Sequence, residues 1–531
     1  MADAYLAILA PLLFLAAFYR WRRTRLPTPP GPRGYPIVGN LFDMPSERQW
    51  ERYFEWSKKY NSDIIYLNVL GSPIVVLNSY KAANELLSVR SSLYSDRPVS
   101  TMVNELLGWG TFLSFMPYGD AWRARRRAFW QEFNPDHARN HRPRQLWHAR
   151  DLLRRLLDDP ARFLHHIDHT LAASIISIAY GLDVRPEHDP NVARAEKALV
   201  QFQDAAIAGS FIVDILPFVR FVPRWAPGGA FKAYAERARL DTWDMREAPY
   251  KQGVARLRSG AAGPSSILSR SLAKGGIGVD IDRHPDEEII KDVAWVAYGG
   301  GAETSHVALA TFFAAMLLCP EVQRKGQEEL DAYLGSRLPA FEDLPHLPYV
   351  RAIMLETLRW QAVGPLGKPM PFRSHLRPLL TLPPAHLGVA HRLTMDDEYK
   401  GYFIPKGSTV FVNIWALLRD QEHYPAPDTF DPERFLKDGQ IDPRTLDPIP
   451  NFGFGRRICP GRFFAMDSLL ISIASTLFCF DIAKLKDAEG RDIEPNIQYA
   501  SGATRPILPF QCSITPRSAA AAKLIRDSEL V

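Results

Sequence analysis

The sequence predicts a mainly α-helical single domain with a small β portion, preceded by one N-terminal membrane anchor helix. Three observations support this prediction. Apolar residues recur every three or four positions through most of the chain beyond residue 79, two β-rich runs precede that region, and residues 4–19 carry no charge. With 46% hydrophobic and 23% charged residues, the 531-residue chain has enough apolar material for a large core.

The N-terminal segment predicts a single-pass anchor in the endoplasmic reticulum membrane, with the body in the cytosol. Asp3 precedes the apolar stretch, and the arginines that follow it are Arg20, Arg22, Arg23 and Arg25. A secretory signal would carry its positive charge before the apolar stretch, so this order favours an anchor over residues 1–25. A helix that lies in the membrane interface is the alternative.

The chain after the anchor divides into three parts by composition. Residues 26–38 (LPTPPGPRGYPIV) are expected to form a proline-rich hinge, because proline fixes the backbone angle and stiffens the chain. We expect one catalytic body over residues 39–516 and a C-terminal tail over residues 517–531.

Local patterns within the body predict its first elements. The β-rich runs 64–70 and 73–78 are separated by a Gly-Ser pair and predict a hairpin. Residues 144–159 and 322–335 have the spacing of amphipathic helices. Residues 253–282 are polar and rich in glycine, which predicts a surface connection.

Charge and cysteine content exclude two classes of protein. The net charge of +5 comes from 64 basic and 59 acidic residues, without the basic stripe expected of a nucleic-acid-binding protein. The four cysteines are Cys319, Cys459, Cys479 and Cys512. Their spacing contains no CxxC pair, so neither a disulfide framework nor a zinc site is indicated. Cys319 and Cys479 stand in apolar helical runs and are expected to be small buried hydrophobic residues.

Cys459 has different neighbours, in the sequence FGFGRRICPG of residues 452–461. The glycines permit close approach of the loop to a large flat group. Arg457 precedes the cysteine by two residues, and residues 463–478 predict a helix that begins just after it. Nearby positive charge and a helix N-terminus favour a thiolate, which can bind a metal or act as a nucleophile. A nucleophile would need a general base, whereas metal ligation needs none.

Phe452, Gly455, Arg457, Cys459 and Gly461 match every fixed position of the heme-binding signature FxxGxRxCxG. The chain therefore resembles the cytochrome P450 family, and most closely its fungal microsomal members. The resemblance implies the P450 fold, in which heme b lies between a long central helix and the cysteine loop. It also implies that Cys459 is the axial ligand of the heme iron. Phe452, Gly453, Arg457 and Gly461 are expected to contribute to heme binding.

A second segment, DVAWVAYGGGAETSHVALATFF over residues 292–313, predicts a buried helix with three glycines in its middle. Glycine disfavours a helix by up to about 1 kcal/mol relative to alanine, so helix stability does not account for the three glycines. Thr304 can bond to the carbonyl of Gly300, which would loosen the helix. Close helix packing is the alternative explanation. By the resemblance, Glu303 and Thr304 are the acid and alcohol that deliver protons during oxygen activation.

Two further motifs match the family. Glu356 and Arg359 form its ExxR motif and Arg434 its partner arginine, which implies a buried network that fixes the cysteine loop. An exposed ion pair is the alternative for Glu356 and Arg359. Trp122 and Arg126 fit the WxxxR pattern that binds a heme propionate. By the resemblance, His391 and Arg457 assist in binding the propionates. The residues implied to form a basic docking surface for an acidic redox partner are Arg123, Arg125, Arg127, Arg456 and Arg462.

One segment departs from the family pattern. Between PLG (residues 365–367) and GVAHR (residues 388–392) stand twenty residues, 368–387, with five prolines and no acidic residue. We interpret residues 368–387 as a suspected insertion, encoded by an unspliced intron. Codons for Gly367-Lys368 and Leu387-Gly388 can hold splice sites, and splicing would fuse the two glycines into PLGVAHR. A genuine surface loop is the alternative.

These features together predict a membrane-bound heme-thiolate monooxygenase that inserts one atom of dioxygen into a small apolar substrate. The resemblance implies electrons from NADPH through cytochrome P450 reductase, with cytochrome b5 as a possible second partner. The predicted pocket residues are 98–115, Phe211, Tyr298 with Gly299, and 363–366. The alternatives are a heme-thiolate isomerase or dehydratase, which needs no reductase, and a catalytically impaired splice variant that only binds heme.

Overall fold

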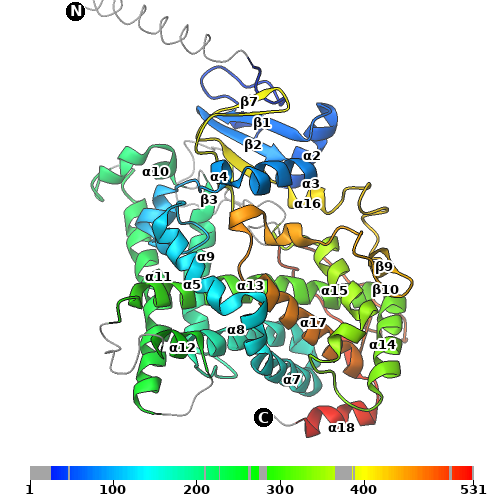
Figure 1. The fold of residues 1–531 in the computed structure, drawn as a ribbon. Coiled ribbons are helices and arrows are strands. Elements are labelled where there is room, and N and C mark those ends of the chain that lie inside the picture. Colours follow the sequence, from blue (N-terminus) through cyan, green and yellow to red (C-terminus); the bar gives the residue numbers. More distant parts are fainter. Residues whose placement is uncertain are drawn as a thin grey trace, which may run out of the picture.

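The computed structural model describes residues 26–45, 48–208, 211–226, 228–260, 265–273, 284–364, 385–386, 389–500 and 505–528 (Figure 1). The expected anchor over residues 1–25 lies outside this part of the chain. The suspected insertion also lies outside it, except for the backbone of residues 385–386. The chain is mainly helical with small sheets, as the sequence predicts.

Ten helices of ten or more residues lie within the described ranges and form most of the body there. They are α2 (Gln49–Lys59), α5 (Asp120–Phe133), α7 (Arg142–Asp158), α8 (Phe163–Tyr180), α9 (Pro190–Ala206), α11 (Phe231–Arg258), α13 (Glu287–Leu318), α14 (Pro320–Leu334), α15 (Pro348–Trp360) and α17 (Arg462–Cys479). The shorter helices are α3 (Tyr80–Ala83), α4 (Ser91–Tyr94), α6 (Pro135–Ala138), α10 (Ile212–Ile215), α12 (Ile267–Ala273), α16 (Ile414–Leu417) and α18 (Ala519–Asp527).

The largest sheet lies at one end of the molecule, at the top of Figure 1. Its order is β1-β2-β8-β5, from β1 (Ile64–Val69), β2 (Ser72–Leu77), β8 (Thr409–Val412) and β5 (His391–Arg392). The two-stranded sheets pair β3 (Ile207–Ala208) with β4 (Ala385–His386), β6 (Asp397–Tyr399) with β7 (Tyr402–Ile404), β9 (Leu436–Lys437) with β10 (Gln440–Ile441), and β11 (Phe480–Ala483) with β12 (Ser513–Pro516).

The predicted hairpin is confirmed as β1 and β2, which pair in antiparallel register from Ile64 with Leu77 to Val69 with Ser72. Its turn residues Leu70 and Gly71 have φ angles of 50° and 83°. Two consecutive positive φ angles give the turn the twist that joins neighbouring strands closely.

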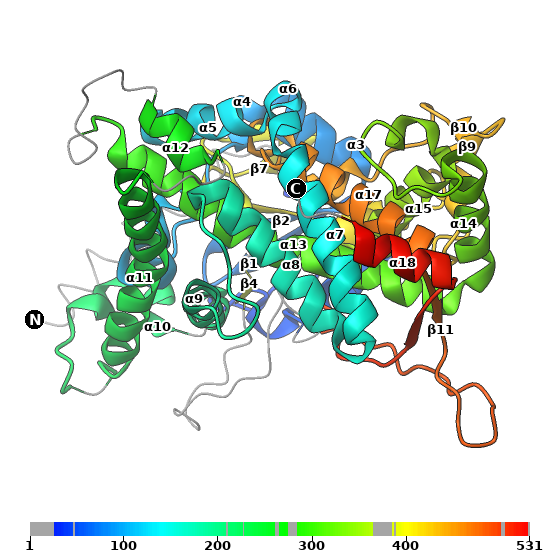
Figure 2. The same cartoon turned by 90° about the horizontal axis from the view of Figure 1, so that it is seen from below.

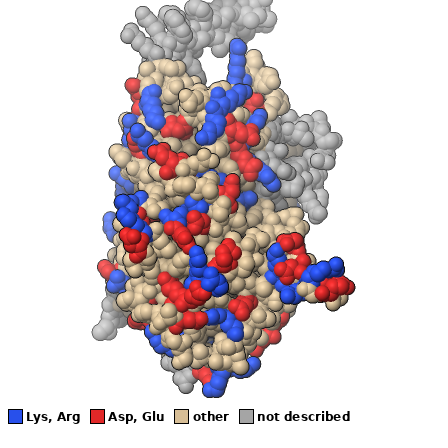
Figure 3. Space-filling view, turned by 90° about the vertical axis from the view of Figure 1, so that its right-hand side faces the viewer, with Lys and Arg blue, Asp and Glu red and all other residues tan. Residues whose placement is uncertain are grey.

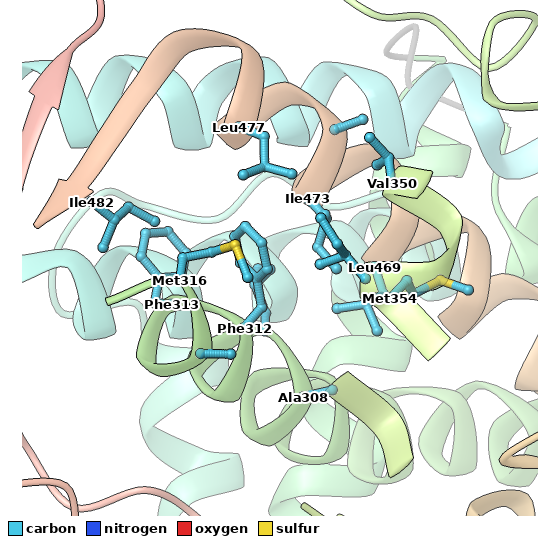
Figure 4. Packing of buried hydrophobic residues seen from close by; sticks show 14 of the residues in the cluster. Ala308, Phe312, Phe313, Met316, Val350, Met354, Leu469, Ile473, Leu477 and Ile482 are labelled. Atoms are coloured by element: carbon cyan, nitrogen blue, oxygen red, sulfur yellow. The ribbon is translucent and has the colours of Figure 1, made fainter. Parts of the chain in front are cut away.

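Helix α13 joins two hydrophobic cores. Its first half packs with α5, α8, α9 and α11, and its second half packs with α8, α15 and α17. Figure 4 shows the second core, where the rings of Phe312 and Phe313 and the thioether of Met316 on α13 meet branched side chains of α17. The labelled residues from these two helices are Ala308, Phe312, Phe313, Met316, Leu469, Ile473 and Leu477. Helices α13 and α17 are long and apolar enough to cross a membrane, but most of each is buried within the body.

The predicted surface connection over residues 253–282 is wrong for part of its length. Residues 253–258 continue α11, and α12 buries Ile267 and Leu268. Gly253 lets the two helices approach, because a Cβ there would lie 2.5 Å from Leu268 and 2.8 Å from the carbonyl oxygen of Tyr180. The glycine that suggested a loop is therefore a packing residue.

The predicted hinge and tail both contact the body. The carbonyl of Pro30 accepts a hydrogen bond from the Tyr66 amide at 3.0 Å, and that of Pro27 accepts one from the Phe403 amide at 2.8 Å. Residues 519–527 of the expected tail form α18, which packs near α7 in the view of Figure 2 and fully buries Ile525. The folded body therefore extends beyond residue 516.

Acidic and basic side chains are mixed on the face shown in Figure 3. Several charged side chains of the body form ion pairs, such as Lys325 with Glu433, and Arg517 with Asp331 at 2.6 Å.

Candidate functional site

The cysteine loop closes on itself before α17 begins. The Cys459 amide donates a hydrogen bond to the carbonyl of Phe452 at 2.6 Å. Gly453 and Gly455 have φ angles of 81° and 55°, which disfavour any other residue. A Cβ at Gly455 would lie 2.0 Å from the carbonyl oxygen of Leu87, whereas a Cβ at Gly461 would have no atom within 4 Å outside its chain neighbours. The contacts of the protein therefore explain the first two glycines but not Gly461.

The charges around Cys459 differ from those predicted. Burial raises the pKa of the thiol, while the Gly461 amide and the positive charges of Arg126 and Arg462 lower it, with a net upward result. Desolvation therefore outweighs the effect of the neighbouring charges, and the anionic state of the sulfur stays a prediction. A thiolate at this position would need a positive charge in direct contact with the sulfur, and a bound metal ion supplies such a charge.

Arg457 acts on the backbone rather than on the sulfur. Its guanidinium donates hydrogen bonds to the carbonyls of Ser95, Leu113 and Met116 at 2.7, 3.4 and 2.8 Å. The guanidinium also lies 4.3 Å from the centre of the Trp122 ring. Burial lowers the pKa of Arg457 to about 10, so the site holds a desolvated positive charge.

Arg97 belongs to the same cluster of positive charge, and the sequence did not indicate it. Arg97 is buried and donates to the carbonyls of Ser114, Val389 and Ala390 at 3.0, 2.7 and 2.7 Å. Burial and the charge of Arg457 hold its pKa well below the usual value. Arg97 follows no periodic pattern, and two of its partners lie almost 300 residues away in the chain, so local sequence gives no signal for it.

Trp122 and Arg126 lie one turn apart on α5, as the WxxxR spacing predicts. The Trp122 side chain is buried, yet its Nε1–H group has no hydrogen-bond partner among the residues that the structure describes. Arg126 is half-buried and makes no hydrogen bond or ion pair with any residue that the structure describes. Burial lowers the pKa of Arg126 to about 10, and the nearby Cys459 opposes that shift. Both side chains thus have unused donors close to the cysteine loop.

His391 lies beside these cations but has limited capacity to donate. Its Nδ1 lies 2.7 Å from the carbonyl oxygen of Tyr94, which can only accept, so Nδ1 carries the proton. Burial and the charge of Arg97 hold the pKa of His391 well below its usual value. In the neutral ring Nε2 is an acceptor, so His391 can bind a carboxyl group only where that group carries the proton.

The middle of α13 differs from its two ends. Residues 290–298 and 307–317 are buried, whereas Gly300 and Thr304, which lie between these two segments, are exposed. The hydroxyl of Thr304 donates to the carbonyl of Gly300 at 2.9 Å, which is the bond predicted from the sequence. Glu303 accepts a hydrogen bond from the amide of Gln203 on α9 at 3.0 Å. The predicted acid and alcohol therefore stand on the accessible part of the helix.

Glu356, Arg359 and Arg434 form a network in the interior. Arg359 donates from Nε and Nη2 to the two carboxylate oxygens of Glu356 at 2.6 and 2.8 Å, and both side chains are fully buried. Arg434 donates to Glu356 at 3.2 Å, and so does the amide of Asp431 at 2.8 Å. Burial raises the pKa of Glu356 against the opposing effect of Arg359. An exposed pair is thereby excluded.

Asn451 connects this network to the cysteine loop, and sequence reasoning missed it. Its side chain donates to the carbonyl of Leu358 at 2.7 Å and accepts from the amide of Val363 at 3.3 Å. Asn451 immediately precedes Phe452, whose carbonyl binds the Cys459 amide. The end of α15 therefore sets the start of the loop through one side chain.

The residues present fit a heme. A buried Trp122 N–H group without a partner, an unpaired Arg126, and the buried charges of Arg97 and Arg457 match the two carboxylates of a porphyrin. Cys459 supplies a soft ligand suited to iron. These residues would hold the heme, which when bound activates dioxygen.

The proposed basic docking surface is partly wrong. Arg125 forms an ion pair with Asp292 of α13 at 2.6 Å and is mostly buried, so it is not available to a partner. Arg123 pairs with Asp120, Arg456 donates to the Tyr118 hydroxyl at 2.6 Å, and Arg462 donates to the Cys459 carbonyl at 3.2 Å. Arg127 is exposed.

A small cavity of about 20 Å³ is lined by only some of the predicted pocket residues. Its lining includes Pro98, Val103, Asn104 and Phe115 from the predicted stretch 98–115, together with Arg97, Phe202, Ala206, Val389 and Ala390. Tyr298 is not part of this lining, and its hydroxyl donates to the Asn191 carbonyl at 2.9 Å. Phe211 packs against Tyr234 with ring centres 5.4 Å apart. Residues 365–366 lie outside the described residues.

The helical fold and the cysteine loop define a heme-thiolate oxidoreductase. Comparison with known proteins gives the family directly: the sequence model "Cytochrome P450" matches residues 29–370 and 381–513. The chain belongs to the cytochrome P450 family.

Similar curated proteins are fungal monooxygenases. The chain is 40% identical over 506 residues to cytochrome P450 monooxygenase ple1 of Rhodocybe pseudopiperita, covering 94% of this chain and 92% of the relative. It is 41% identical over 513 residues to cytochrome P450 monooxygenase 98 of Postia placenta, covering 96% and 94%. It is 39% identical to tryptamine 4-monooxygenase of Psilocybe cyanescens, covering 96% and 97%. Like these relatives, the protein is a cytochrome P450 monooxygenase, an oxidoreductase.

Proposed function

We propose that the protein inserts one oxygen atom into a small apolar organic substrate, with electrons from NADPH through cytochrome P450 reductase. In the balanced reaction, substrate R–H, dioxygen, NADPH and one proton give R–OH, water and NADP⁺. The observation that carries this proposal is the pair of unused donors, Trp122 Nε1–H and Arg126, beside the half-buried Cys459.

Each predicted site residue has a separate role in this reaction. Cys459 would ligate the iron of heme b, while Trp122, Arg126 and Arg97 would bind the propionates. Gly453 and Gly461, with Phe452, would let the loop lie against the ring. Thr304 and Glu303 would hold and transfer protons at the exposed middle of α13, and the network of Glu356, Arg359 and Arg434 would keep the loop in place.

Two measurements test the proposal. Reduction of the purified protein under carbon monoxide is expected to give the red-shifted Soret band of thiolate ligation, and C459S is expected to lack it. NADPH oxidation with added reductase then separates a monooxygenase from a heme-thiolate isomerase or dehydratase, which consumes no NADPH. A protein with the Soret band but no NADPH-dependent oxygen consumption would contradict the proposed reaction.

The second candidate is a catalytically impaired splice variant that only binds heme. The family match leaves residues 371–380 unmatched, and these lie within the suspected insertion 368–387. The residues on either side of the suspected insertion bond to the body. The Val363 amide donates to the Asn451 side chain, and the Val389 carbonyl accepts from Arg97. Sequencing the mature transcript tests this candidate: a message that retains these codons in every copy would exclude an intron.

We also propose that the N-terminal segment anchors the protein in the endoplasmic reticulum membrane. The charge order around residues 4–19 supports this. Large apolar side chains are also exposed near the N-terminal sheet and after α10, both at the upper end of Figure 1. They are Tyr35, Ile37, Phe42, Phe218, Phe221 and Trp225. Removal of residues 1–25 is expected to weaken membrane association, and a variant that also carries W225S and F221S is expected to be soluble; persistence in the membrane fraction would contradict this.

A further inference from the structure

We infer that Gln203 of α9 is a positioning residue that orients Glu303 for proton transfer, an inference that rests on the proposed function. The Nε2 of Gln203 lies 3.0 Å from Oε1 of Glu303 on α13. Glu303 immediately precedes Thr304, so the amide acts on the acid of the predicted pair. Gln203 itself does not contact the reacting atoms.

The position of Gln203 is fixed by its neighbours on α9. The ring of Phe202 packs against Trp109 and Phe115, with centres 4.7 and 5.0 Å apart. The hydroxyl of Tyr234 donates to the carbonyl of Gln201 at 3.0 Å. The residues on either side of Gln203 are thus held, so its amide reaches Glu303 from a defined direction.

An amide N–H group has the chemistry that orientation requires. It donates a hydrogen bond to a carboxylate but does not ionise at neutral pH, so it directs Glu303 without replacing it as the acid. The hydroxyl of Thr304 is committed to the Gly300 carbonyl as a donor, which leaves its oxygen able to accept from a proton donor nearby. Gln203 would therefore select the orientation in which Glu303 serves Thr304.

The same helix also forms part of the cavity. Phe202 and Ala206 of α9 line it, on either side of Gln203 in the sequence. A movement of α9 would therefore move the Gln203 amide and the cavity lining together.

Dioxygen itself is the probe, so no identified substrate is needed. With NADPH and reductase, dioxygen takes two electrons and two protons to give hydrogen peroxide, or four electrons and four protons to give two waters. Poor proton delivery favours peroxide. Q203L is expected to raise the ratio of peroxide to water about two- to tenfold, the effect of one neutral hydrogen bond. Its carbon monoxide band and thermal midpoint are expected to match the unaltered protein.

Q201L is the matched control, because Gln201 lies on the same helix and donates to Asp241 of α11 at 2.8 Å instead of to α13. It is expected to leave the ratio unchanged. Combined with E303Q, Q203L is expected to add nothing. An unchanged ratio in Q203L, an equal rise in Q201L, or an additive rise in the double variant would each overturn the inference. A rise in T304A but not in Q203L would overturn this inference alone, whereas no rise in T304A would overturn the proposed function as well.

Discussion

Arg359 donates two hydrogen bonds to the carboxylate of Glu356 three residues earlier on α15, and neither side chain has any exposed surface. Two further N–H groups of Arg359 bind the carbonyls of Leu418 and Thr429 at 3.0 and 3.2 Å. The buried ion pair is therefore hydrogen-bonded to its surroundings. Removal of Arg359 would leave Arg434, at 3.2 Å, as the remaining charge partner of Glu356.

R359A is expected to destabilise the protein by about 3–5 kcal/mol, because Glu356 would lose the nearer of its two charge partners in the interior. The urea midpoint of unfolding measures this change. R324A is the matched control, because Arg324 pairs with Glu328 on the exposed face of α14 and such a pair contributes about 1 kcal/mol at most. Equal effects of the two substitutions would show that the Glu356 network does not support the fold.

W122F is expected to accelerate the loss of heme about tenfold or more, the effect of a lost hydrogen bond to a charged group. The orphan N–H group of Trp122 would otherwise bind a propionate. Transfer of heme to an excess of apomyoglobin measures the rate. W295F is the control, because Trp295 is also buried with an unpartnered Nε1 but belongs to the core of α13. A heme-loss rate in W122F equal to that of W295F would remove Trp122 from the heme site.

G455A is expected to prevent heme binding, since its Cβ would lie 2.0 Å from the Leu87 carbonyl oxygen. Heme absorbance per mole of purified protein is the measurement. The control is G407A, where φ is 85° but no atom stands within 4 Å of the added Cβ. Both substitutions pay the same backbone strain, about 1 kcal/mol, so only the close contact distinguishes them. Normal heme content in G455A would contradict the loop geometry.

Acid is expected to destabilise the protein through its buried histidines. Burial lowers the pKa of His141 to about 4 and that of His148 to about 3. The unfolded chain binds protons at these residues from about pH 6.5 downward, whereas the folded chain does not. Stability therefore falls as pH decreases from 6.5 to 4, by about 1.4 kcal/mol per pH unit for each histidine. H148F removes one of the two protonation sites, so it is expected to reduce the pH slope of the unfolding free energy by about 1.4 kcal/mol per pH unit. An unchanged slope in denaturant titrations would disprove the prediction.

Deletion of residues 368–388, which leaves PLGVAHR, is expected to raise both heme content and NADPH-dependent oxygen consumption. The shortened chain restores the spacing of the family around His391. The full-length chain, expressed and purified in parallel, is the comparison. Equal heme content and turnover in the two forms would favour a genuine loop over a retained intron.

Local spacing was enough to predict several parts of the site. The cysteine loop, the bond from Thr304 to Gly300, and the placement of Glu356 and Arg359 on one helix face all depend on residues within a few positions of one another. The hairpin β1–β2 is predictable for the same reason, because a Gly-Ser pair stands between two short β-rich runs, although the turn itself is Leu70-Gly71 and Ser72 already belongs to β2.

Contacts between distant segments were not predictable in this way. Arg97, Asn451 and Gln203 bind partners that are distant in the sequence and become neighbours only in the folded protein. Arg125 pairs with Asp292 in the interior instead of contributing to an exposed basic surface. Gly253 suggested a loop, because only the folded structure shows that its missing side chain makes room for Leu268.

The sequence by itself therefore determined the helical class, the family and the ligand cysteine, because these depend on residue types at short, fixed spacing. The tertiary structure alone decided the electrostatic state of the site. Burial sets the pKa of Cys459 and Arg126, and it depends on how much of the rest of the chain excludes water from them.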